Sequence, residues 1–229
     1  MVDSYAKAVD SNTLGSIDSC IGFSKIVDER TAKKIAQSRF ELVLAAGYDK
    51  EALEILQKNE QLKIVKINTS FEDIKTLISQ ELKITPFGVL EQDKNRADFN
   101  KDTFKIQTKK KPEQEQIEDA IFAFKVAKHA KSNAIIIAKN FKTISIGQAE
   151  TSFAEACENA VDLACDSTKD AVLATDSKIL TPEVLHAAAR GRLALIIQAG
   201  GSLNDKKLIE QCDKYEISMI TTGIEHFKS

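Results

Sequence analysis

The feature that most constrains the fold is an alternation of helical and short apolar segments through the second half of the chain. Apolar residues follow helical spacing up to Lys131, and the continuous branched run Ala134–Ala138 then has the character of a strand covered on both faces. The predicted helices are Glu113–Lys131, Phe153–Ala164, Pro182–Ala189 and Asp205–Tyr215, and the predicted strands are Ala134–Ala138, Lys142–Ile146, Ala171–Ala174, Leu193–Gln198 and Ile217–Thr221. This order predicts an α/β fold of three α/β/α layers, with a mostly parallel sheet between helices.

Part of this order recurs in the first half of the chain. The runs 41–47, 49–58 and 62–67 have the pattern strand, helix, strand, and 195–221 repeats it. Both copies place Ala-Gly at the end of the first strand and Asp-Lys at the start of the helix. Two interpretations stay open: an internal duplication of one α/β unit, or the general likeness of any two strand-helix-strand units.

The boundary between the halves is predicted near a basic run. Residues 71–111 are less regular than their surroundings and end in Lys109-Lys110-Lys111 before Pro112. A run of this kind is typical of a domain boundary or of a solvated surface. We therefore predict two related subdomains, 1–108 and 109–229.

Composition excludes several classes of function. The chain has 229 residues, 43% hydrophobic and 29% charged, with a formal net charge of −2, so bulk electrostatics gives no reason to expect nucleic-acid binding. No apolar run is long enough to span a bilayer, and the N-terminal residues lack the pattern of a signal peptide, so we expect a cytoplasmic protein with no membrane partner. The four cysteines form no Cys-x-x-Cys pair, and no metal site is expected from the spacing of cysteines and histidines.

Two loops are candidates for a site. Lys131 ends the first long helix and Asn133 follows it, so both could contact a substrate. Alternatively, Asn133 caps the helix and Lys131 complements its dipole. Gly200, Gly201 and Ser202 lie between a strand and a helix, where free N–H groups bind anions, although a tight turn explains the same residues. Asp176 follows another strand, a position that suits either a functional carboxylate or the start of a loop.

Several of these segments resemble one enzyme family. Lys125–Lys128, Lys131–Ile135 and Ala138–Asn140 follow the pattern K-V-A-K-x-x-K-S-N-A-I-x-x-A-K-N. That pattern is similar to the AICAR transformylase half of the bifunctional AICAR transformylase/IMP cyclohydrolase family. The likeness continues at Thr175-Asp176, in the Gly-Gly-Ser loop and at His226-Phe227, and more loosely through the first half.

The resemblance implies a fold, a reaction and a set of site residues. The fold would be two cytidine-deaminase-like subdomains, and the active sites would lie at a homodimer interface. The family transfers a formyl group from 10-formyltetrahydrofolate to AICAR without a metal. Residues implied to bind the purine intermediate are Lys131, Asn133, Asp176 and Phe227. Gly200, Gly201 and Ser202 are implied to lie on the folate side.

Departures from the family pattern point to impaired catalysis. The 229 residues contain no K-H-x-N-P-C-G run, which carries the catalytic histidine of the family. Phe153 and Glu225 stand where the family has arginines, and Lys178–Thr181 replace an aromatic folate wall. Each lost charge-assisted hydrogen bond costs about 1.5–3 kcal/mol.

Two functions follow from the resemblance. We predict an AICAR transformylase-like protein that is catalytically impaired and acts as a scaffold, a ligand-binding protein or a partner, with no bound cofactor. The alternative is an active formyltransferase part, completed by a missing segment or a partner chain. Only in that case would 10-formyltetrahydrofolate serve as co-substrate.

Overall fold

The computed structural model describes residues 1–229 except 70–72, 74–79, 98, 100–103 and 227–229. It divides into two compact units, Met1–Asn95 and Arg96–Ser229. The predicted boundary after residue 108 therefore falls later than the division in the structure. The reason is strand β6 (Lys105–Ile106), which pairs antiparallel with the last strand of the second unit and so belongs to that unit.

The second unit is built around a six-stranded sheet with the order β6-β11-β10-β9-β7-β8. Its strands after β6 are β7 (Ile135–Lys139), β8 (Lys142–Gly147), β9 (Val172–Thr175), β10 (Leu195–Gln198) and β11 (Ser218–Thr221). Strands β9, β10 and β11 run parallel, whereas β7 is antiparallel to both β9 and β8. The predicted strands and the hairpin that joins 134–138 to 142–146 are thus confirmed to within two residues at their ends.

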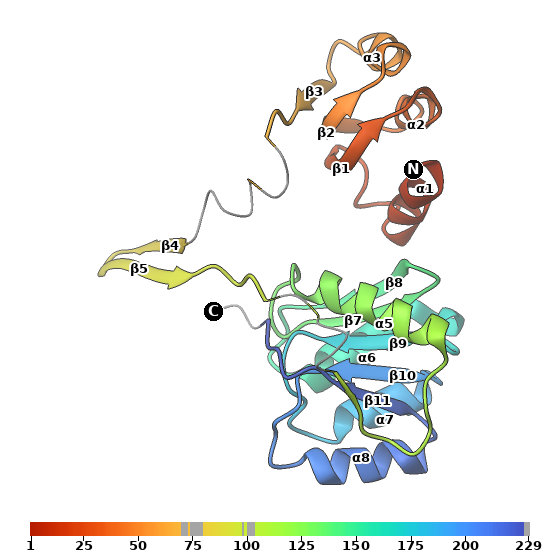
Figure 1. The fold of residues 1–229 in the computed structure, drawn as a ribbon, viewed down its shortest axis with the longest axis vertical. Coiled ribbons are helices and arrows are strands. Elements are labelled where there is room, and N and C mark those ends of the chain that lie inside the picture. The colour runs from red at the N-terminus through yellow and green to blue at the C-terminus, as the bar shows by residue number, and fades with distance from the viewer. Residues whose placement is uncertain (70–72, 74–79, 98, 100–103, 227–229) are drawn as a thin grey trace. The chain divides into compact units, whose positions relative to one another are not determined.

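Helices cover both faces of this sheet, as Figure 1 shows. Helix α5 (Gln114–Ala127) lies on one face, where Phe124 packs with Ile136 and Leu195. The other face is covered by α6 (Phe153–Ala164), α7 (Glu183–Arg190) and α8 (Asp205–Lys214). Because neighbouring residues of a strand point to opposite faces, Ile135 and Ile137 join this second core while Ile136 joins the first. The predicted three-layer α/β arrangement is therefore confirmed in the second unit.

Local sequence accounts for the helix ends. The side chain of Glu113 and that of Gln116 form a capping box at the start of α5, and Ser152 Oγ accepts a hydrogen bond from the N–H of Glu155 at the start of α6. Helix α5 ends at Ala127, with Lys128 as its C-cap. The prediction that the helix continues to Lys131 is wrong, and with it the interpretation of Lys131 and Asn133 as a helix cap.

The first unit contains a smaller parallel sheet, β1-β2-β3. Its elements are α1 (Val2–Ser11), β1 (Ser19–Val27), α2 (Glu29–Ile35), β2 (Phe40–Tyr48), α3 (Lys50–Leu56) and β3 (Lys63–Lys66). Tyr5, Ile35, Val43 and Leu56 form its core with neighbouring residues. This element order repeats that of α6-β9-α7-β10-α8-β11 in the second unit, which extends the sequence repeat to three helix-strand pairs.

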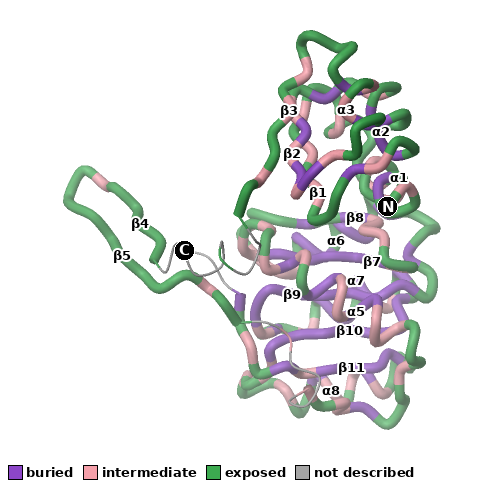
Figure 2. Tube along the Cα trace, turned by 45° about the horizontal axis from the view of Figure 1, so that its top comes forward, coloured by how far each residue is buried: buried purple, intermediate pink, exposed green. Residues whose placement is uncertain are grey.

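A separate hairpin completes the first unit. Strands β4 (Gln80–Thr85) and β5 (Gly88–Asp93) pair only with each other in the described part of the chain. Figure 2 shows the contrast in burial, with the hairpin almost entirely exposed and the strands of the large sheet buried. The hairpin lacks the packing that stabilises the two sheets. A two-stranded hairpin without such packing is only marginally stable in water.

Candidate functional site

One edge of the large sheet gathers the residues selected from the sequence. The carboxyl ends of β9, β10 and β11 share this edge because the three strands are parallel. Strand β7 runs the other way, with Ile135 opposite Thr175, so the residues before β7 reach the same edge. The loops that carry Asn133, Asp176 and Gly200 therefore meet at one end of the sheet. In parallel α/β sheets this is the usual place for a ligand site.

Asp176 is the centre of the polar contacts at this edge. Its side chain is completely buried, and its Oδ2 accepts a hydrogen bond from the Ser132 hydroxyl at 2.5 Å. Its Oδ1 accepts a second hydrogen bond from the backbone N–H of Ala134 at 3.0 Å. A buried carboxylate needs such donors to offset its loss of hydration. Both oxygens of Asp176 are thus used to hold the start of β7 against the end of β9.

Asn133 and Lys131 are held by the loop that follows β8. The side-chain Nδ2 of Asn133 donates to the carbonyl oxygen of Glu150 at 3.1 Å. The backbone N–H of Lys131 donates to Oε1 of Gln148 at 3.1 Å, while the residue itself is exposed. Asn133 is therefore a fixed amide in this loop, and the Lys131 side chain is the more accessible of the two groups.

The glycine loop after β10 has the backbone geometry of an anion site, but its donors are occupied. Gly200 and Gly201 have φ of +77° and +88°, conformations that suit glycine, and a Cβ on Gly200 would lie 2.8 Å from Cγ2 of Thr221. The N–H groups of Gly201 and Ser202 donate to the two carboxylate oxygens of Asp205, at 2.7 and 3.2 Å. The carboxylate of Asp205 therefore takes the place that an external anion would occupy.

A groove of about 550 Å³ opens beside this loop. Its lining consists of Lys105, Gln107, Ala199, Gly200, Gly201, Asp205, Thr221, Thr222 and Gly223. One wall is fixed by a hydrogen bond from Nε2 of Gln107 to Oγ1 of Thr221, at 2.7 Å. Among these lining residues, Lys105 is the one cation and Asp205 the one anion. The groove is large enough for a small polar molecule.

The C-terminal segment returns to the same edge. The backbone N–H of His226 donates to the carbonyl oxygen of Asp176 at 2.6 Å, and the buried His226 ring lies 4.6 Å from the ring of Phe124. Next to it, Nζ of Lys178 lies 3.3 Å from Oε1 of Glu225. Both charged side chains are more than two-fifths exposed, so this ion pair contributes little to stability. Its charges nevertheless neutralise each other where the family pattern has a lone arginine.

The sequence identified most, but not all, of this arrangement. Lys131, Asn133, Asp176 and the Gly200–Ser202 loop do lie at one edge, whereas Phe227 lies outside the described residues. Residues not selected from the sequence include Ser132, Gln148, Asp205, His226 and Gln198, whose buried Oε1 accepts a hydrogen bond from the N–H of Ile179 at 2.8 Å. The partners of Asp205, Gly201 and Ser202, are only four and three residues away. The partners of the other four residues are distant in sequence, so spacing carried no signal for them.

Two of the cysteines, Cys157 and Cys212, lie in the core of the second unit. Burial is the main cause that raises the pKa of the Cys157 thiol, and that of Cys212, to about 12, which leaves both thiols protonated and unreactive. Within the described ranges, no three residues of the His, Cys, Asp and Glu types come close enough together to hold a metal ion. None of the helices in those ranges combines the length and apolar character needed to cross a membrane.

Comparisons with known proteins identify the family to which the chain is similar. The model of the AICARFT/IMPCHase bienzyme family matches residues 1–163. The bifunctional purine biosynthesis protein PurH of Acetivibrio thermocellus is 38% identical over 229 residues, which cover 99% of this chain and 44% of the relative. PurH proteins of a Thermoanaerobacter species and of Caldicellulosiruptor saccharolyticus are 38% and 36% identical over 226 residues, covering 99% of this chain and 44% and 43% of theirs.

The fold and the edge site define an α/β protein with a polar loop cluster at the carboxyl ends of parallel strands. The sequence matches narrow this class, and the chain belongs to the AICARFT/IMPCHase bienzyme family of purine biosynthesis. It spans less than half the length of the curated relatives it matches.

Proposed function

We propose that this chain is an AICAR transformylase-like protein whose formyl transfer is impaired, and that it acts as a scaffold, a ligand-binding protein or a partner of an active enzyme. The observation that carries the proposal is the internal pairing of the polar groups at the sheet edge. Asp176 is bound by Ser132 and Ala134, and the glycine-loop donors are bound by Asp205. A substrate would have to displace these contacts before it gained its own.

The charge at position 225 supports the same proposal. The resemblance implies a phosphate-binding arginine there, and this chain has Glu225 beside Lys178. Loss of one charge-assisted hydrogen bond costs about 1.5–3 kcal/mol. This loss weakens the binding of a phosphorylated purine intermediate by about 10-fold to about 10²-fold.

The alternative function is an active formyltransferase part that uses 10-formyltetrahydrofolate. It is favoured by the meeting of Asn133, Asp176 and the glycine loop at one edge, since the resemblance assigns these residues to a common active site. In that case the K-H-x-N-P-C-G run would come from another segment or another chain. A cytoplasmic location and a homodimer, both expected from the sequence, belong to either function and stay predictions.

Formyl transfer and ligand binding separate the two functions. The purified chain is mixed with AICAR and 10-formyltetrahydrofolate, and product is followed by absorbance while calorimetry measures the binding of each ligand. We expect no turnover by the chain alone. Turnover that Asn133→Ala abolishes would overturn the impaired-enzyme proposal, because it would place that amide in a working site.

A charge-reversal variant tests the phosphate argument. Glu225→Arg removes the anion and restores the cation of the family pattern, so we expect AICAR affinity to rise by at least about tenfold. The matched control is Glu210→Arg on the exposed side of α8, which makes the same change in net charge away from the edge. Equal effects of both variants would show that only overall charge matters and would contradict the local argument.

A further inference from the structure

The loop between β8 and α6 holds the Asn133 segment at three points. The N–H of Ala149 donates to the carbonyl oxygen of Lys131 at 3.4 Å, and the N–H of Lys131 donates to Oε1 of Gln148 at 3.1 Å. The third contact is the hydrogen bond from Nδ2 of Asn133 to the carbonyl oxygen of Glu150, at 3.1 Å. Ala149 has a φ of +59°, a left-handed conformation that is costly for a residue with a Cβ. Such strain persists where surrounding contacts fix the backbone, and it is common at binding sites.

Helix α6 anchors this loop at both ends. A Cβ on Gly147, the last residue of β8, would lie 1.9 Å from the carbonyl oxygen of Ala156, so the strand end and the helix are in close contact. At the other end of the loop, Ser152 caps the helix. Between these ends, Nδ2 of Asn159 donates to Oε1 of Glu150 at 2.9 Å. Because Ala156 is completely buried in the core, α6 is a fixed support for the loop.

These contacts decide which end of the Asn133 amide is available to a ligand. A backbone carbonyl only accepts hydrogen bonds, so the NH₂ group of Asn133 must face Glu150 and its oxygen Oδ1 must point away. Within the part of the chain that the structure describes, this oxygen has no hydrogen-bond partner. Asn133 is only half-buried, and Oδ1 is open to solvent. A fixed and accessible amide oxygen selects a ligand group that carries an N–H donor.

We propose that Glu150 and Asn159 are positioning residues, which hold the Asn133 amide so that its oxygen accepts a hydrogen bond from an N–H group of the ligand. Asn159 fixes the side chain of Glu150, and the backbone of Glu150 in turn orients Asn133. The inference rests on the proposed function, in which Asn133 contacts the purine intermediate. It deepens that function by naming the residues that set the direction of the contact and the ligand chemistry that the contact selects.

Variants of Asn159 and Glu150 test the positioning directly. Asn159→Ala removes the donor that fixes Glu150, whereas Glu150→Gln keeps an oxygen that Asn159 can reach. The readout is the NMR signal of the Asn133 NH₂ group, assigned by its loss in Asn133→Asp. We expect its hydrogen exchange to become at least about threefold faster in Asn159→Ala and to stay within about twofold in Glu150→Gln.

Two controls separate positioning from a general loss of stability. Asn159 is exposed, so the urea midpoint of Asn159→Ala should equal that of the natural chain. Leu163→Ala changes another exposed side chain of the same helix without changing the net charge, and it should leave the Asn133 signal unaltered. Exchange of the Asn133 NH₂ group that is the same in Asn159→Ala and in Leu163→Ala would overturn the positioning role.

Calorimetric titration with AICAR shows what the positioning does for the ligand. We expect Asn159→Ala to weaken AICAR binding about three- to tenfold and Glu150→Gln to leave it within about twofold. If the natural chain binds no AICAR, the ligand half of the proposal fails together with the ligand-binding role. The NMR comparison does not need a ligand, so it distinguishes that failure from a failure of the positioning.

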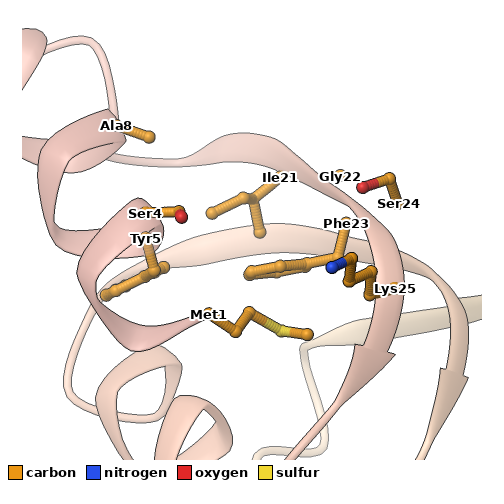
Figure 3. Close-up of a pocket in the computed structure, with 9 residues that line it drawn as sticks. All are labelled: Met1, Ser4, Tyr5, Ala8, Ile21, Gly22, Phe23, Ser24 and Lys25. Carbon is orange, nitrogen blue, oxygen red and sulfur yellow. The ribbon is translucent and has the colours of Figure 1, made fainter. Parts of the chain in front are cut away.

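A cavity in the first unit provides the control for binding elsewhere. It lies between α1 and β1, has a volume of about 290 Å³ and is shown in Figure 3. Lys25 is its one lining residue with a charged side chain, so Lys25 would pair with the phosphate of AICAR if that molecule bound there. We expect Lys25→Ala to leave the affinity unchanged. A loss of affinity in Lys25→Ala but not in Asn159→Ala would place the ligand in the first unit and overturn the proposal.

Discussion

Asp119 offers the sharpest test of how the second unit is stabilised. This carboxylate on α5 is 6% exposed and accepts hydrogen bonds from the N–H groups of Asn140 and Phe141, both at 2.7 Å. The two acceptor contacts hold the β7–β8 turn, whose residues have φ of +56° and +53°. Left-handed backbone at two successive residues, one of them a phenylalanine, is costly, so the turn depends on an external acceptor.

The expected cost of Asp119→Ala follows from these contacts. Two hydrogen bonds to a charged acceptor are worth about 3–6 kcal/mol together when neither donor finds another partner. Asn140 and Phe141 are exposed, so water replaces part of these two hydrogen bonds in the variant. We therefore expect Asp119→Ala to lower the stability of the second unit by about 2–3 kcal/mol. The stability of Asp119→Asn should lie between that of Asp119→Ala and that of the natural protein. Its amide oxygen replaces one acceptor, whereas its NH₂ group opposes the second backbone donor.

The measurement must report on the second unit alone. Hydrogen exchange of the β7 and β8 amides, followed in increasing urea, gives the free energy of opening for that part of the sheet. The control is Glu115→Ala, an exposed carboxylate in the first turn of the same helix, for which we expect a change below about 0.5 kcal/mol. An Asp119→Ala variant as stable as this control would refute the reasoning.

Two further predictions concern thiols and pH. Burial holds the pKa of Cys157 and Cys212 near 12, so their thiolate fraction at pH 8 is about 10⁻⁴. Ellman's reagent should therefore label only the two exposed cysteines, Cys20 and Cys165, until the protein is denatured. Fast labelling of all four cysteines in the folded protein would contradict this prediction. The hydrogen bond from the Thr31 N–H to Asp28 lowers the pKa of that carboxyl, so its stabilising effect is present above the unfolded-state pKa and is lost as the pH falls through the lower folded-state value. Asp28→Ala should therefore destabilise the first unit by about 0.5–2 kcal/mol at neutral pH, as measured by urea unfolding, and this loss should shrink as the pH falls below the unfolded-state pKa of about 3.9. A difference that does not depend on pH would contradict the capping role.

The second unit was predictable because its pattern is strong. Continuous apolar runs such as Ala134–Ala138 identify strands that are covered on both faces, and the structure places Ile135, Ile136 and Ile137 in complete burial. Strand β1 was not predicted, since Gly22, Ser24 and Lys25 interrupt its apolar pattern. A strand that lies at an edge and is covered on one face carries a weaker signal than a central strand.

The site was predictable in its members and not in its contacts. Strand ends and helix starts indicated Asp176 and the glycine loop, because parallel strands bring their carboxyl ends together. The contacts of Asp176 with Ser132 and of Gly201 with Asp205 depend on side-chain directions that no spacing rule supplies. For that reason the sequence suggested an anion site where the structure has a carboxylate of the protein itself.

The irregular register of β1 has a consequence for how the protein behaves at high concentration. The pairing of β1 with β2 shifts between Phe23 and Ile26, which marks a bulge at Ser24 and Lys25. A bulge bends an edge strand, and a lysine on it resists burial, so the regular edge is limited to about Cys20–Phe23. An edge this short admits one strand and does not template a growing stack of sheets. The same irregularity that weakened the signal of β1 in the sequence therefore makes this strand a poor template for fibrous aggregation.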